Sequence, residues 1–425
     1  MVSLNTVEKN GRAFGASVSQ WFPLRGIGGQ RPINRDMPEP AIAFLSKHKL
    51  HVRKNGVTQA VESEFERTVR ERTASMERRN AWKTQGRGAM FMGRFTPAQP
   101  GLGDATPVLL TGLTAGPEGA LLYSMETDAV SGIFLLDATG TETRLFHTAE
   151  FRIRHAALHP DRGTLAAAAF HKDGVRSNIV VLPLHGTDLA EVTEGDSFDQ
   201  VPQWVPGARR RIVFQSAGVG RNVAGHFAGL GPCTIQQLDL DSGDLEEIAS
   251  ETGHDLLQPR QTEDGTLYYI RKPYESGVPH ANLVNSLLSS MTDATLFPFR
   301  MARAVFQYFN IFSMMYTGKP LVTNKGAVQR PPDPRQLFIH GNLANALMVH
   351  PPEDQAQGRA PSSWELVRRR PGGQTEAVAR NALAFDIAGD GSLVYSDGAS
   401  IVRIGPDGSL ERLLQSEWID QVLVL

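Results

Sequence analysis

The side chains that could do chemistry at a shared site are two imidazoles and three carboxylates. Imidazole nitrogens and carboxylate oxygens are the usual protein ligands of zinc and calcium. The candidates are His155, Asp199, His254, Asp255 and Asp420. Each falls in or beside a segment that reads as a β-strand. Strands that bring them to one centre would form a metal or small-molecule site. The candidates do not recur at one position of a repeat, so the sequence does not support a ring of metal ligands, and we expect no metal and no cofactor.

Other catalytic signals are weak. The sequence has no G-x-S-x-G nucleophile elbow. Its one cysteine, Cys233, lies far in sequence from any obvious base and reads as a structural thiol. The glycines of 218–225 lack the strand-to-helix context of a phosphate-binding loop, so 216–232 is predicted to be a flexible loop. We therefore assign no catalytic residue.

Composition narrows the class of protein. The 425 residues are 41% hydrophobic and 21% charged, with a formal net charge of -2. A dedicated nucleic-acid binder would carry an excess of basic residues, so nucleic acid is not an expected partner. The first residues lack an apolar run of secretory type, and a single cysteine suits a reducing compartment. We expect a cytoplasmic protein.

A repeated pattern indicates how the strands are organised. A tight polar turn with glycine, followed at once by an apolar run, occurs around Gly119, Gly163, Gly207, Gly265 and Gly391. The first three glycines are 44 residues apart. A period in the low forties with several short strands is typical of propeller blades. The turn glycines are expected to supply a positive φ.

The two ends of the chain complete the pattern. Segments 41–46, 49–54 and 58–63 read as the last three strands of a blade, and 418–425 reads as its first strand. One blade built from both ends would close the ring and leave no open sheet edge. The predicted fold is therefore all-β: a six-bladed β-propeller over 38–425 with a split first blade, preceded by an N-terminal arm over 1–37.

The segment SFDQVPQWVPGARRRIVFQSAG, residues 197–218, resembles the repeat of TolB-type propellers, with Pro202, Trp204, Pro206 and Gly207 at the matching places. The resemblance implies a propeller that binds other proteins across one face. A looser resemblance is to uncharacterised bacterial propellers that accompany MoxR-type ATPases and von Willebrand A-domain proteins. It implies that the partner is a component of an ATPase system.

Three insertions interrupt the repeats, at about 64–105, 216–232 and 274–362. In a meander of four strands, the connections that carry them leave the sheet on the same face. The first should begin with a helix over 63–85, because Ser63 and Glu66 form a capping-box pattern. A helix lying against the rim and a helix that docks a partner both fit this segment.

The third insertion contains the most apolar stretch of the chain, Leu296 to Thr317. It reads as a helix over 299–316 with one narrow polar stripe. Three environments could cover it: the propeller with its helical neighbour 281–291, a partner protein, or a membrane surface. The partner-binding candidates are Phe299, Arg303, Phe306, Phe309, Phe312 and Met315.

These features favour a non-catalytic scaffold that binds a partner through the face carrying the insertions. The first alternative is a propeller enzyme, hydrolase-like or lactonase-like, with a metal or small-molecule site in the central channel. The second is a peripheral membrane adaptor that uses the 296–317 helix.

Overall fold

The structure is a computed structural model, and it describes residues 39–84, 108–127, 129–161, 163–172, 174–207, 209–221, 227–274, 336–339, 342–345, 360–416 and 418–425. The chain divides into two compact units, Met1–Pro38 and Glu39–Leu425, and every described residue belongs to the second. The predicted N-terminal arm and the candidates from Phe299 to Met315 lie outside the described residues.

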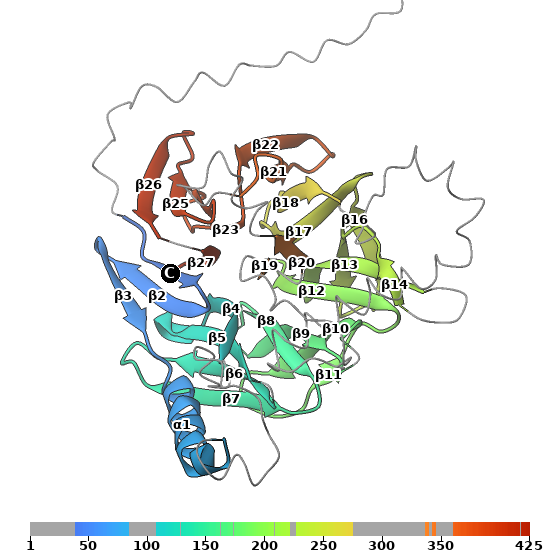
Figure 1. Cartoon of the computed structure of the whole chain (residues 1–425). Helices are drawn as coiled ribbons and strands as arrows, with labels where there is room; N and C mark the ends of the chain where they lie inside the picture. The colour runs from blue at the N-terminus through green and yellow to red at the C-terminus, as the bar shows by residue number, and fades with distance from the viewer. Residues whose placement is uncertain are drawn as a thin grey trace, which may run out of the picture. The chain divides into compact units, whose positions relative to one another are not determined.

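The described part of the second unit is built from antiparallel four-stranded meanders (Figure 1). The strand that begins each meander lies toward a common centre in Figure 1. The successive meanders are β27(Ile419–Val424) with β1(Ile42–Ser46), β2(Lys49–Lys54) and β3(Val57–Val61); β4(Leu109–Ala115), β5(Leu121–Glu126), β6(Ser131–Leu136) and β7(Glu142–Thr148); β8(Arg152–Leu158), β9(Thr164–Phe170), β10(Ser177–Pro183) and β11(Ala190–Glu191); β12(Ser197–Trp204), β13(Arg211–Arg221), β15(Thr234–Asp239) and β16(Leu245–Ala249); β17(His254–Gln261), β18(Leu267–Pro273), β21(Glu365–Arg369) and β22(Thr375–Arg380); and β23(Ala384–Ile387), β24(Leu393–Ser396), β25(Ser400–Ile404) and β26(Leu410–Gln415).

The two ends of the described chain share a sheet, as predicted. Strand β27 pairs with β1 in antiparallel register, with Ala43 opposite Leu423. The pairing buries β1 completely. The expected strand 49–54 has the predicted bounds, and those of the other three expected strands at the chain ends differ by one or two residues at either end.

The turn glycines explain most of the short connections. Gly119, Gly265 and Gly391 take φ of 78°, 82° and 80°, in the left-handed region where a Cβ is costly. Gly207 also has a positive φ, of 130°. Gly163 does not have a positive φ, so the prediction is wrong for this turn.

Apolar clusters lie between consecutive meanders. Leu122 and Ile133 pack with Leu165 and Val180, which joins the β4–β7 meander to the β8–β11 meander. Equivalent clusters among the described residues join each of the remaining consecutive pairs of meanders. The cluster that contains Phe44 joins the last meander to the first. Burial of apolar surface between sheets is the main stabilising term of such an arrangement.

The first insertion begins with the predicted helix, whereas the second differs from the predicted loop. Helix α1(Glu64–Thr84) follows β3, and Ser63 Oγ accepts the amide hydrogen of Glu66 at 3.1 Å, the bond expected of a capping box. The glycine-rich segment is not simply a loop. Strand β13 runs on to Arg221, and β14(Phe227–Leu230) pairs with it as a hairpin. The third insertion contains a second hairpin, β19(Gln336–Ile339) with β20(Asn342–Asn345).

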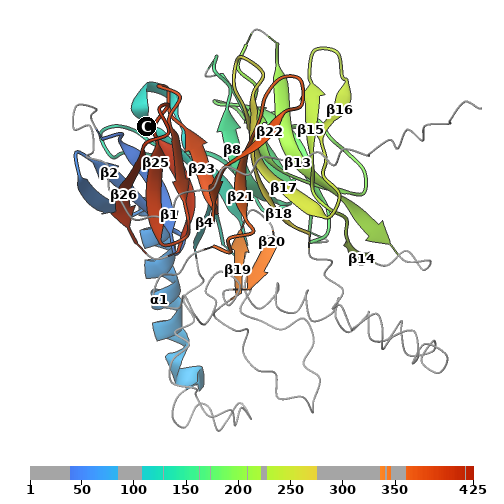
Figure 2. The ribbon, with the colours of Figure 1, turned by 90° about the horizontal axis from the view of Figure 1, so that it is seen from above.

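Strands β14, β19 and β20 and helix α1 all project on one side of the meanders in Figure 2. The hydroxyl of Tyr274, at the start of the third insertion, donates to the carbonyl oxygen of Leu230 at 2.6 Å, which holds two insertions together. Turns such as 137–141 connect the meander strands at their other ends. The side that carries α1 and the β13–β14 hairpin is the insertion-bearing face.

Candidate functional site

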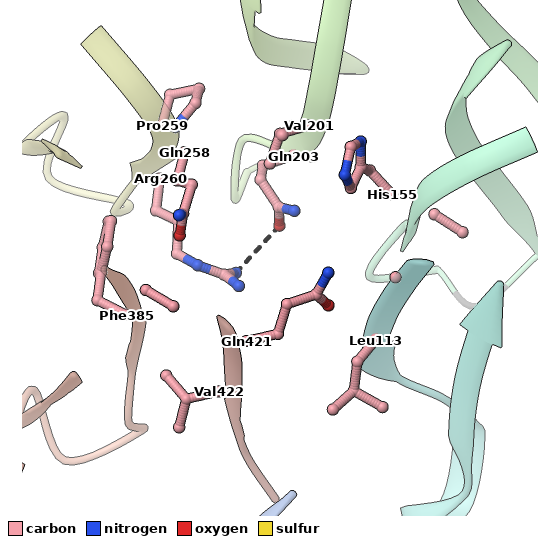
Figure 3. A pocket seen from close by; sticks show the side chains of 13 residues that line it. Leu113, His155, Val201, Gln203, Gln258, Pro259, Arg260, Phe385, Gln421 and Val422 are labelled. Atoms are coloured by element: carbon pink, nitrogen blue, oxygen red, sulfur yellow. Dashed lines mark hydrogen bonds between the residues drawn. The ribbon is translucent and has the colours of Figure 1, made fainter. Parts of the chain in front are cut away.

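A narrow cavity lies where the first strands of the meanders meet (Figure 3). Its volume is about 40 Å³, enough for two or three water molecules. Strands β4, β8, β12, β17, β23 and β27 all contribute to its lining, with the polar side chains of His155, Gln203, Gln258, Arg260 and Gln421. Residues far apart in sequence therefore form one polar site.

Arg260 reaches into this cavity from β17 (Figure 3). Its Nη1 donates to Gln203 Oε1 at 3.0 Å, and the same nitrogen lies 3.3 Å from Asp386 Oδ1. Asp386 is buried, and its carboxylate also accepts the amide hydrogens of Ile387 and Val424, each at 2.8 Å. The carboxylate therefore balances the charge of the guanidinium and ties β23 to β17 and β27.

Two glutamine side chains complete the polar lining. Gln258 Nε2 donates to the carbonyl oxygen of Leu383 at 2.8 Å, and the backbone amide of Gln258 donates to Gln215 Oε1 at 2.9 Å. Gln421 Nε2 donates to the carbonyl oxygen of Thr111 at 3.3 Å. Each side-chain amide nitrogen thus donates to the backbone of a neighbouring meander: Gln258 bonds to the residue before β23, and Gln421 bonds to β4.

The backbone around the cavity is bent by bulges. The register of β8, β12 and β17 shifts at equivalent places, and a residue with positive φ occurs at each shift: His155 at 53°, Val201 at 50° and Gln258 at 54°. A left-handed conformation is unfavourable for a β-branched residue such as Val201. Bulges of this kind re-aim side chains and are common beside binding sites.

Only one of the five sequence-predicted channel residues lines the cavity, and that residue is His155. Asp199 is buried within the sheet instead. Its Oδ2 accepts from Thr193 Oγ1 and its Oδ1 from Ser216 Oγ, both at 2.6 Å. Burial raises the pKa of Asp199, against the opposing effect of these two hydrogen bonds. Its observed role is to join β12 to the strand beside it and to the preceding meander.

Asp255 and His254 have local structural partners. Asp255 is buried, accepts the amide hydrogen of Cys233 at 2.9 Å and lies 3.2 Å from Lys272 Nζ. His254 contacts the carbonyl oxygen of Thr252 through Nδ1 at 3.2 Å. Burial raises the pKa of the Cys233 thiol, the behaviour of an unreactive structural cysteine.

Asp420 occupies the bulge of β27, between Ile419 and Gln421. It is buried, and its Oδ1 has no hydrogen-bond partner among the described residues. Burial raises the pKa of Asp420 to about 6, and the nearby His48 opposes the shift. Its neighbour Gln421, not Asp420 itself, lines the cavity.

The sequence interpretation missed the residues that line the cavity beside His155. Gln203 and Arg260 each follow a proline, in the parallel segments Val-Pro-Gln and Gln-Pro-Arg. Pro202 and Pro259 occupy equivalent bulges. The repeated proline was the available signal, because a proline within a strand indicates a bulge.

Comparison with known proteins gives similarity in fold only. No protein-family model and no curated protein matches the sequence. Among solved structures, the chain is similar to TolB from Acinetobacter baumannii, at 12% identity and a TM-score of 0.46 over 90% of this chain. It spans 65% of that TolB chain.

Two enzymes are among the other similar structures. The tricorn protease is 11% identical with a TM-score of 0.44, over 91% of this chain and 34% of the other. An oligogalacturonate lyase in complex with manganese is 10% identical with a TM-score of 0.38, over 72% of this chain and 64% of the other. Similarities this low carry no argument about activity.

Two features of the described residues bear on the metal-dependent and membrane-bound alternatives. They contain no group of three or more His, Cys, Asp or Glu side chains placed to hold a metal ion. Among the helices of the described ranges, none is long and apolar enough to cross a membrane.

The first turn of helix α1 is anchored to the β4–β7 meander. The amide hydrogens of Glu64 and Phe65 donate to the carboxylate of Glu142 on β7, both at 3.1 Å, and Tyr123 donates to the same carboxylate at 2.6 Å. The ring of Phe65 lies 5.0 Å from that of Phe134. A carboxylate at the N-terminus of a helix also complements the helix dipole. The start of α1 thus packs on the neighbouring meander.

Proposed function

We propose that the protein is a cytoplasmic, non-catalytic scaffold: a closed six-bladed propeller that binds a protein partner through its insertion-bearing face. The pairing of β27 with β1 and the apolar cluster between the last and first meanders support closure. A closed ring leaves no long sheet edge to pair with other chains, so binding depends on loops and surfaces.

The observation that carries the partner-binding part is the placement of the insertions. The other face keeps short turns such as 137–141 and 405–409, whereas α1 and the β13–β14 hairpin project from the insertion-bearing face. Function is found more often on loops that a rigid scaffold carries than on the scaffold itself. The first turn of α1 is fixed by a hydrogen bond to Glu142 and by the packing of Phe65 on Phe134, so the surface that it presents is preorganised for binding.

The partner is a protein, and a component of an ATPase system is one class to examine first. The candidate contacts Phe299, Arg303, Phe306, Phe309, Phe312 and Met315 form part of this proposal. A pull-down from the native host should recover a stable partner with the full chain. Deletion of 282–317 should abolish recovery while the melting temperature stays within a few degrees of the full chain.

A matched control is Asp407→Lys, in the exposed turn between β25 and β26 on the opposite face. It should leave recovery unchanged. If the partner is still recovered after the deletion but is lost with Asp407→Lys, binding takes place on the opposite face and the proposal is contradicted. Flotation with liposomes that Phe306→Glu weakens would favour the membrane adaptor instead.

A second candidate function is a small-molecule site in the central channel. The observation that favours it is the polar cavity to which all of the meanders contribute.

A further inference from the structure

The central cavity presents hydrogen-bond donors and acceptors in comparable numbers. On the acceptor side are Gln258 Oε1 and Gln421 Oε1, for which the described residues supply no donor, although the amide nitrogen of each side chain is occupied. On the donor side is Gln203 Nε2, whose own oxygen is occupied by Arg260. A ligand that both accepts and donates would satisfy these groups.

Charge in the cavity is balanced, which limits the ligand further. The one guanidinium of the lining, that of Arg260, lies beside Asp386, whose carboxylate also receives two backbone amides. An anion would find no unpaired positive charge there, and a cation would find no open carboxylate. Burying an unbalanced charge is costly, so the cavity suits a neutral ligand.

Gln258 is held in a fixed position at the edge of the cavity. Gln258 is 6% exposed. It lines the cavity from a bulge, where it has a positive φ. A bound N–H group would supply a donor to the side-chain oxygen of Gln258, for which the described residues supply none. The neighbouring residues with positive φ, His155 and Val201, line the same cavity from equivalent bulges.

We propose that the cavity binds the carboxamide group of a small neutral ligand. A primary amide carries one acceptor oxygen and an NH₂ donor group on a planar frame. The oxygen would accept from Gln203 Nε2 or Arg260, and the NH₂ group would donate to Gln258 Oε1 and Gln421 Oε1. The volume of about 40 Å³ fits the head group alone, so the rest of the ligand extends toward the mouth of the channel. This inference does not depend on partner binding.

The probe for the test is acetamide, whose methyl signal reports binding by saturation-transfer NMR. Acetate and acetone serve as comparators, because acetate adds a charge and acetone lacks the NH₂ group. Acetamide should bind at least tenfold more tightly than either. Gln203→Leu and Gln421→Leu should each weaken acetamide binding about tenfold, which is the loss expected for one or two hydrogen bonds. Gln59→Leu, on the exposed strand β3, is the matched control and should change nothing.

Melting curves establish that each variant is folded, and either leucine variant alone is sufficient if the other unfolds. Acetamide affinity that is equal in the wild type and a folded leucine variant would overturn the proposal. Acetate binding as tightly as acetamide would overturn the ligand class. An absence of saturation transfer to acetamide in the folded wild type would show that the cavity holds water only.

Discussion

The guanidinium of Arg154 and the carboxylate of Glu126 meet in two hydrogen bonds, from Nε to Oε2 at 2.9 Å and from Nη2 to Oε1 at 2.7 Å. Their side chains are 5% and 1% exposed, and the pair links β8 to β5 of the preceding meander. Glu126→Ala would leave the guanidinium buried without this carboxylate. Loss of one partner of a buried pair costs about 3–5 kcal/mol, so the free energy of unfolding in urea should fall by that amount.

The control is Lys172→Ala, which removes an exposed ion pair with Glu150 whose side chains are 67% and 80% exposed. Its effect should stay below about 1 kcal/mol. Equal losses for the two variants would show that the Arg154–Glu126 pair is not buried as described.

Much of the strand arrangement is predictable from the sequence because it depends on local signals. Apolar runs that follow polar glycine turns identify β5, β18 and β24, and the pairing of β27 with β1 follows from the incomplete repeats at the chain ends. The β13–β14 hairpin was missed because its strands are rich in glycine. Its pairing depends on backbone hydrogen bonds that leave no apolar pattern.

The candidate site is much harder to predict than the fold. Alternation along a strand indicates which side chains share a face, but a bulge reverses the alternation beyond it. Asp199 precedes the bulge of β12 and is buried against Thr193 and Ser216, whereas Gln203 follows it and lines the cavity. Thr193 lies six residues before Asp199 and Ser216 lies 17 residues after it, and their spacing alone does not reveal that both hydroxyls donate to this carboxylate.

The buried carboxyl of Asp420 predicts a dependence of stability on pH. Because burial raises its pKa in the folded state to about 6 from 3.8, the protonated form is favoured by folding. Its contribution is fully present below the unfolded pKa and is lost as the pH rises through the folded value. Two pKa units correspond to about 3 kcal/mol.

Asp420→Asn keeps the side chain neutral at every pH. Relative to this variant, the wild type should lose about 2–3 kcal/mol of unfolding free energy between about pH 4 and about pH 7. Urea titrations across that range measure the difference. Parallel pH profiles for the two proteins would contradict the burial of an ionisable group at this bulge.

Gly112 predicts a packing effect beside the cavity. A Cβ at this position would lie 2.6 Å from Ser124 Oγ and 2.8 Å from the backbone nitrogen of His155. Gly112→Ala should therefore lower the free energy of unfolding by about 1–3 kcal/mol. Gly389→Ala, which meets nothing within 4 Å, should change it by less than about 1 kcal/mol. A harmless Gly112→Ala would show that β4 and β8 are not in close contact.

Cys233 predicts low thiol reactivity. Its side chain is buried, and burial raises the pKa of the thiol, so little thiolate forms near neutral pH. A thiol-specific chromogenic reagent should react slowly with the native protein and fully once the protein is unfolded in guanidinium. Rapid reaction of the native protein would place the thiol at the surface.

The most direct test of the proposed function is cross-linking from each face. A photoactivatable residue is introduced singly at Ala149 and Thr252, in exposed connections on the insertion-bearing side, and at Ser242 and Gln374, in exposed turns on the opposite side. If the protein is a scaffold that uses the insertion-bearing face, the partner recovered by pull-down should be captured from the first two positions and not from the second two. Capture from Ser242 and Gln374 alone would contradict that account.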